Sequence, residues 1–373
     1  MFINNNIRKI VMNKHNKKVY DFAAKSAQID SIKKFPEFQD YMTKFEKIYE
    51  GGLFNIKASY GESLYYGHIQ QLFRYCNMNP KDYVYFPIME HGIQFVTRVR
   101  ENQQMRIFQG KDNIEGWRKY YKGYPFYMIG PYIHYVESYY ESDEIAKYKS
   151  ELGKVLTIFP AHTYELADNF YNEQEFVDYI MDIMAKDYDS VIISVYWADV
   201  NAEVYKLFKE RGAILMSAGF RGDTNFIRRL KTILELSDTV VSNAFGTFIG
   251  YAYYLNKVVK LIDGNVIVDS SKESVDSPEM ENELHQIEKQ FMRAFAIDKP
   301  EFTKEQLELC EYYWGLDKLK TKEEIQAILK INKQILKEAK GFIKWIPWAA
   351  QKVMKKGKLT ELEYSVLSEA MGE

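Results

Sequence analysis

The chain has 373 residues, of which 46% are hydrophobic and 27% are charged. This composition is typical of a soluble globular protein and excludes a mainly disordered one, and the length suffices for two domains of ordinary size. A formal net charge of −2 gives no global field that would recruit nucleic acid. The 30 Tyr and 23 Phe residues fit either an ordinary core or the flat faces of carbohydrate-handling clefts.

Only two cysteines are present, Cys76 and Cys310, which excludes a disulfide framework and a cysteine-rich metal site. The N-terminal stretch lacks a continuous apolar core of signal-peptide length. No stretch reaches the roughly 18 apolar residues that a membrane span needs. We therefore expect a cytoplasmic protein.

Residues 1–150 are expected to form the first domain. Residues 82–89 read as a strand that ends in Glu90-His91-Gly92. Polar groups directly after an apolar strand are where α/β proteins place functional residues. His91 is a candidate general base because imidazole titrates near neutrality, with Glu90 beside it. The alternative is that His91 forms only local hydrogen bonds and that the glycine serves the turn.

The second domain is expected over residues 151–270. Its first strand, 155–159, leads into a turn that contains His162 and Thr163. From Glu173 onward, helical stretches alternate with short apolar runs, which is the signature of βαβ units on a parallel sheet. Both domains thus place a histidine at a strand exit, which favours two similar domains facing a central cleft.

The most informative part of this domain runs from residue 238 to residue 257. TVVSN (239–243) is expected to be a buried strand, and the turn after it is expected to open a helix near Gly246. A helix start preceded by small polar residues is a natural anion site. A phosphorylated ligand is the first to test.

Residues 271–373 are expected to be a mostly helical extension that packs back on the first domain. Within it, residues 340–358 combine Trp345 and Trp348 with six lysines. Basic residues with exposed tryptophans are typical of segments in a membrane interface, which predicts a peripheral membrane contact. The alternative is a helix that buries its tryptophans and shows its lysines to water.

The stretch SDTVVSNAFGTFIGYAYYLNKVVKLI (237–262) resembles the donor-binding segment of GT-B glycosyltransferases, especially bacterial capsule, lipopolysaccharide and teichoic-acid enzymes. The resemblance implies a GT-B fold of two Rossmann-like domains and a role in surface polysaccharide synthesis. It assigns donor binding to Ser242, Asn243, Gly246 and Thr247. This chain has Asn-Lys-Val-Val at 256–259, where the family usually has Gly-Lys-Pro-Val.

Further resemblance implies the remaining roles. Glu90-His91-Gly92 resembles the His-Gly turn of related polymer-forming transferases, and His162 and Thr163 fall near the loop that faces the donor. The partners expected are a nucleotide-sugar donor and a glycan or lipid-linked acceptor, at the inner face of the cell membrane. Since the donor segment contains no Glu-x7-Glu, an inverting reaction is the simpler hypothesis.

No cofactor or metal is expected. Asp187 and Asp189 match a DxD motif superficially, but they lie between a helix and a strand and read as a solvated turn. Two other functions stay open. A nucleotide-sugar epimerase of the same fold would need acidic residues to move a proton, and a non-catalytic glycan- or nucleotide-binding module would need no base at all.

Overall fold

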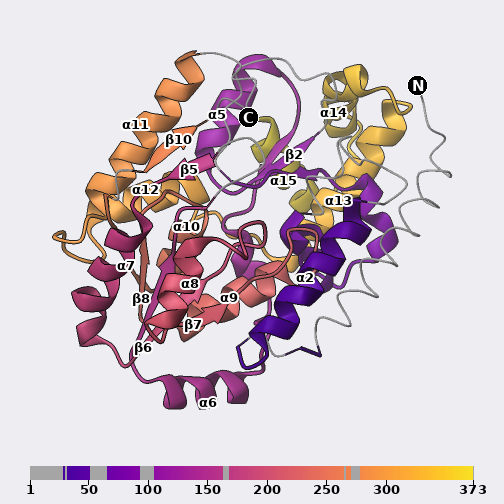
Figure 1. Cartoon of the computed structure of the whole chain (residues 1–373). Coiled ribbons are helices and arrows are strands. Elements are labelled where there is room, and N and C mark those ends of the chain that lie inside the picture. The colour runs from indigo at the N-terminus through magenta and orange to yellow at the C-terminus, as the bar shows by residue number, and fades with distance from the viewer. Residues whose placement is uncertain are drawn as a thin grey trace. The chain divides into compact units, whose positions relative to one another are not determined.

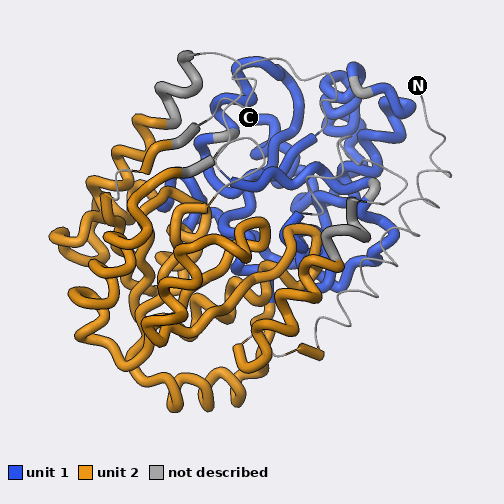
Figure 2. Tube along the Cα trace, viewed as in Figure 1, with its two compact units in different colours: residues 1–21, 49–136, 310–373 blue, residues 22–48, 137–309 orange. Residues whose placement is uncertain are grey.

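The structure is a computed structural model, and it describes residues 28–29, 32–50, 65–92, 105–162, 168–263, 266–269 and 278–372. The chain divides into two compact units (Figure 2). Unit 1 comprises residues 1–21, 49–136 and 310–373, and unit 2 comprises residues 22–48 and 137–309. Each unit contains a parallel sheet with helices, so the predicted α/β class is confirmed.

The observed division differs from a domain change at 150/151 and from a separate extension after 270. Helix α6 (Ser142–Leu152) belongs to unit 2, because Tyr148 and Leu152 pack against Ile192 and Ile233. The C-terminal residues are shared, since 278–309 join unit 2 and 310–372 join unit 1.

Unit 2 contains a five-stranded parallel sheet in the order β7-β6-β4-β8-β9. In chain order this is 3-2-1-4-5, the arrangement of doubly wound nucleotide-binding folds. The strands are β4 (Val155–Phe159), β6 (Ser190–Ser194), β7 (Ile214–Met216), β8 (Thr239–Ser242) and β9 (Val258–Leu261). The helices between them are α7 (Glu173–Asp182), α8 (Glu203–Glu210), α9 (Phe226–Leu236) and α10 (Phe248–Tyr254), and the 3₁₀ helix η4 (Met184–Asp187) follows α7.

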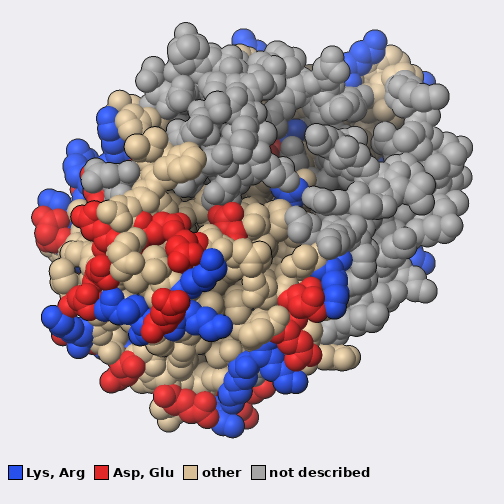
Figure 3. Space-filling view, viewed as in Figure 1, with Lys and Arg blue, Asp and Glu red and all other residues tan. Residues whose placement is uncertain are grey.

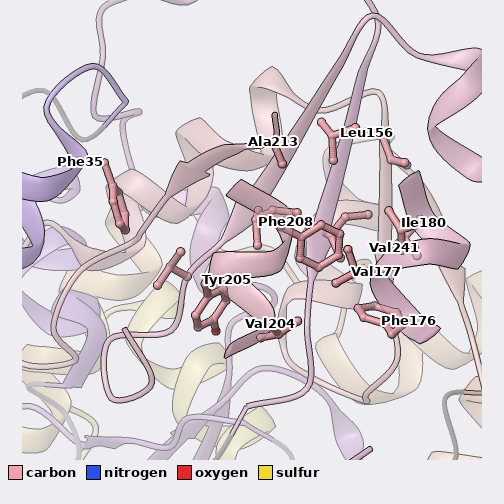
Figure 4. Close-up of a cluster of buried hydrophobic side chains, with 14 residues drawn as sticks. Phe35, Leu156, Phe176, Val177, Ile180, Val204, Tyr205, Phe208, Ala213 and Val241 are labelled. Atoms are coloured by element: carbon pink, nitrogen blue, oxygen red, sulfur yellow. The ribbon is translucent and has the colours of Figure 1, made fainter. Parts of the chain in front are cut away.

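Helices cover both faces of this sheet because its strands are nearly continuous buried runs, whose successive side chains point to opposite faces. Leu156 and Ile158 of β4 belong to one core cluster, which includes Val177 of α7 and Phe208 of α8 (Figure 4). Residue Val155, which points to the opposite face, belongs to the cluster formed with α6 and α9. The predicted alternation of helices with strands from Glu173 onward is confirmed in unit 2 (Figure 1).

Further elements contribute to unit 2. Helix α2 (Phe35–Glu50) places Phe35 in the first core cluster. Strands β5 (Asp168–Phe170) and β10 (Ile267–Asp269) form an antiparallel pair. Helix α11 (Pro278–Ala294) precedes α12 (Lys304–Trp314), along which the chain passes into unit 1.

Unit 1 contains a three-stranded parallel sheet in the order β1-β2-β3. Its strands are β1 (Ile88–Met89), β2 (Arg106–Phe108) and β3 (Phe126–Met128), and α5 (Lys111–Tyr120) connects the last two. Ile114 and Trp117 of α5 pack against Phe108 and Phe126. The prediction of a strand over residues 82–89 is right only for its last two residues.

Unit 1 also contains short helices before and after its strands. Residues Pro80–Tyr85 form the 3₁₀ helix η2, and Asn79 caps it by accepting a hydrogen bond from the Lys81 amide. The other short helices within residues 65–136 are η1 (Tyr65–Gly67), α4 (His68–Tyr75) and η3 (Tyr132–Tyr135).

The C-terminal helices of unit 1 are α13 (Lys322–Glu338), η5 (Ile343–Trp345), α14 (Ile346–Lys355) and α15 (Glu361–Met371). Helix α15 contacts β3, and α13 contacts both α14 and α15. Two glycines allow the C-terminal part to approach β2. A Cβ on Gly110 would collide with the main chain of Tyr312 and Tyr313, and one on Gly315 (φ +62°) would collide with the Gln109 carbonyl.

Candidate functional site

The carboxyl ends of the unit 2 strands meet at one edge of the sheet, and the chain order reverses between β4 and β8. Doubly wound folds bind ligands at this switch point. Here the two strand exits are tied together. The side-chain oxygen of Asn243 accepts a hydrogen bond from the Ala161 amide at 2.7 Å, and the Ser242 hydroxyl donates to the Phe159 carbonyl at 2.6 Å.

Two of the predicted donor-binding residues, Ser242 and Asn243, form these hydrogen bonds between the strand exits. Ser242 is 1% exposed, and its oxygen also accepts a hydrogen bond from the Ala244 amide. Asn243 is 3% exposed. The Tyr171 hydroxyl, whose pKa is raised by burial above all, donates a hydrogen bond to the Ala161 carbonyl at 3.4 Å. Because the side chains of Ser242 and Asn243 are enclosed, they fix the shape of the switch point.

His162 lies at the exit of β4, where its ring stacks on Tyr196 at the exit of β6, with the centroids 3.6 Å apart and the planes 14° apart. Both side chains are half-buried. Tyr196 is held in turn by its main-chain amide, which donates to the Tyr205 hydroxyl at 3.1 Å. This stacked pair gives the sheet edge a flat aromatic surface of the kind on which a base or sugar ring packs.

The turn after β8 carries the other two predicted residues. Gly246 and Thr247 are half-buried, and α10 begins at Phe248 with no side-chain cap from Thr247. The Phe248 ring stacks on Phe159 at 4.4 Å, which holds the start of α10 against the end of β4. Thr163 lies outside the described residues.

A cation at the exit of β7 was not among the predicted site residues. Arg221 is half-buried and lies over the Trp197 ring, 5.3 Å from its centroid. The loop that carries it is anchored by a buried ion pair, in which Arg229 contacts Asp223 at 2.8 Å. In the sequence, Arg221 is marked only by its place in the loop that follows an apolar strand.

In unit 1, Glu90 and His91 follow β1 as predicted, but their surroundings differ. Glu90 is 2% exposed and forms an ion pair with Arg106 of β2, which is 3% exposed. The Arg106 guanidinium also lies 4.1 Å from the centroid of the Trp117 ring. Glu90 is therefore held by a charged partner on the neighbouring strand, and its catalytic role stays a prediction.

The His91 ring lies against Tyr65 and Tyr66, with centroids at 5.5 Å and 5.4 Å. Tyr66 has φ +61°, a left-handed conformation that costs a non-glycine residue about 1–3 kcal/mol and that clusters at functional sites. No local sequence pattern indicated that these two tyrosines would lie against His91.

His68 lies close to His91 and is buried. Burial, and then the charge of His91, lower the pKa of His68 to about 3. His68 is therefore neutral near pH 7, and its ring packs edge-on against Tyr132 at 4.9 Å. The Tyr132 hydroxyl donates to the Glu90 carbonyl at 2.7 Å.

Charges of both signs are interspersed over the described surface visible in Figure 3. Among the described residues, no three His, Cys, Asp or Glu side chains gather as a metal site would require. The Asp189 carboxylate accepts a hydrogen bond from the Lys154 amide at 2.7 Å, which gives this half of the DxD match a structural contact.

No described helix has both the length and the apolar character needed to cross a bilayer. Comparison with protein-family models found no matching family, and comparison with curated proteins found no match.

Proposed function

We propose that the protein is a glycosyltransferase of the GT-B type, which moves a sugar from a nucleotide-activated donor to a glycan or lipid-linked acceptor in bacterial surface polysaccharide synthesis. The observation that carries the proposal is the unit 2 switch point. There the exits of β4 and β8 are tied by Asn243, and His162 stacks on Tyr196 beside them. This arrangement supports a nucleotide site.

In the proposed reaction, unit 2 binds the donor and unit 1 supplies the base. His91 removes the proton from an acceptor hydroxyl, whose oxygen forms a bond to the anomeric carbon. The bond from that carbon to the phosphate oxygen breaks, and the nucleoside mono- or diphosphate leaves as an anion. Arg221 and the main-chain amides near Gly246 are candidates to stabilise that anion. The reaction inverts the anomeric configuration and needs no metal.

Nucleotide binding should depend on the stacked pair. Replacing Tyr196 with alanine removes the ring against His162, and we expect a loss of about 1–3 kcal/mol in nucleotide affinity if a base stacks there. Thermal shift with CMP, UDP, GDP and CDP measures this, because a nucleotide present at a hundredfold excess over Kd stabilises the folded protein by about 2.7 kcal/mol.

The matched control is Tyr188→Ala, which removes the same side chain just before β6, at the opposite end of that strand. This variant should keep the full nucleotide-dependent shift. Equal shifts in both variants would remove Tyr196 from the site. Product analysis then separates the functions, because a transferase extends an added glycan whereas an epimerase returns an altered nucleotide sugar.

A further inference from the structure

The segment 340–358 exposes the residues that an ordinary amphipathic helix would bury. Helix α14 buries Ile346, Ala349, Ala350 and Val353, which recur at helical spacing on one side. Trp345 and Trp348 are 40% and 53% exposed. The alternative that this helix buries its tryptophans is therefore wrong.

The exposed rings form one group, the aromatic cluster, which consists of Phe342, Trp345 and Trp348. Ring centroids are 5.1 Å apart for Phe342 and Trp345, and 6.4 Å apart for Trp345 and Trp348. Phe342 is 39% exposed. Exposed large apolar side chains that adjoin one another mark an interaction surface more often than scattered ones do.

The segment that carries the aromatic cluster has only basic charged side chains. Residues 340–358 include six lysines and no acidic residue. Glu338 pairs with Lys352 at 2.8 Å and also with Lys356, and these lysines lower its pKa to about 2, so it stays ionised. It compensates only these two lysines.

The other four lysines are exposed, and no ion pair to any of them is found within the described ranges. We call them the outer lysines: Lys340, Lys344, Lys355 and Lys358. Their uncompensated positive charge complements an anionic surface. Tryptophan prefers the headgroup level of a bilayer, where its ring is buried and its N–H stays hydrated.

We propose that the aromatic cluster inserts into the headgroup region of an anionic bilayer, while the outer lysines bind the lipid phosphates. The proposed partner is the membrane surface, because adjoining indole rings flanked by positive charge fit a fluid anionic interface. The inference is independent of the proposed sugar transfer, since it concerns where the protein binds and not which bond it makes.

Co-sedimentation of the full chain with vesicles tests the proposal. The protein should sediment with vesicles of equal parts phosphatidylglycerol and phosphatidylcholine and remain in the supernatant with phosphatidylcholine alone. Added salt should release it, because salt screens exposed charges. Recovery in the supernatant with both vesicle types would overturn the proposal.

Two double variants separate the contributions. Trp345→Ser/Trp348→Ser should weaken binding at least tenfold, roughly the effect of losing one buried aromatic side chain. Lys344→Glu/Lys355→Glu should weaken it by roughly 30-fold or more, given about a fivefold effect for each lysine near an anionic surface.

Matched controls make the same changes elsewhere. Leu362→Ser/Tyr364→Ser removes two exposed apolar side chains of α15, and Lys186→Glu/Lys209→Glu reverses two exposed lysines of unit 2. Both should bind vesicles as the parent does, and parent-like binding by the tryptophan variant would refute the proposal.

Light scattering without lipid tests whether a second copy of the chain binds the aromatic cluster instead. A parent dimer that becomes a monomer in the tryptophan variant would overturn the lipid assignment.

Discussion

Alanine in place of His91 is expected to lower the rate of sugar transfer by roughly 10²–10⁴-fold, the usual contribution of a positioned general base. His91 is half-buried and belongs to unit 1, whereas the proposed nucleotide site is built from unit 2. We therefore expect the affinity for the nucleotide to be unchanged. The rate of transfer at saturating donor and the nucleotide-induced thermal shift measure the two properties separately.

The control for this change is His285→Ala, which removes an exposed imidazole from α11 and should leave both the rate and the shift as in the parent. Turnover retained by His91→Ala would remove His91 from the mechanism. A lost thermal shift in that variant would instead show that His91 supports nucleotide binding.

Glutamine in place of Glu90 is expected to destabilise the protein by about 3–5 kcal/mol. The carboxylate of Glu90 pairs with Arg106, and both side chains are nearly inaccessible to water. Removing one charge leaves the other buried without its counter-ion, and the guanidinium cannot shed its proton to relieve the cost. Chemical denaturation monitored by tryptophan fluorescence measures the change, since Trp117 lies against Arg106.

Two comparisons isolate the cause. The double variant Glu90→Gln/Arg106→Met should recover most of the lost stability, because no buried charge remains. Glu305→Gln breaks the exposed pair with Arg293 and should cost at most about 1 kcal/mol. If Glu90→Gln costs no more than Glu305→Gln, the buried pair does not stabilise unit 1.

The fold of unit 2 could be predicted because its signals are local. Helical and apolar stretches alternate at short intervals, and Gly212 ends α8 with φ +87°, as expected for a glycine after a helix. The expected strand over 155–159 matches β4, and the expected strand over 239–243 matches β8 closely. Local periodicity cannot, however, give the strand order, which long-range pairing decides.

Unit 1 was harder to predict because its signals depend on distant contacts. The run 82–89 is rich in aromatic and β-branched residues, as strands are. Its buried Tyr83 and Phe86 are three residues apart, however, which suits a 3₁₀ helix. Gly110 and Gly315 read locally as turn residues, yet each leaves room for main chain from a remote segment.

The candidate site could be predicted in part. Parallel strands end at one edge of a sheet, and at that edge the Ala161 amide after β4 donates a hydrogen bond to the Asn243 side chain after β8. The stack of His162 on Tyr196 depends on the pairing of β4 with β6, which no local pattern specifies. The pairing of Glu90 with Arg106 likewise follows from the β1–β2 register.

The most direct test of a donor site at the unit 2 switch point is amide hydrogen exchange with each of the four nucleotides. We expect one of the four nucleotides to slow amide exchange at Ala161, Tyr196 and Asn243, which lie at three neighbouring strand exits. Exchange at the opposite end of the strands, around Lys154 and Tyr188, should not change. No slowing with any nucleotide, or slowing confined to unit 1, would contradict the account.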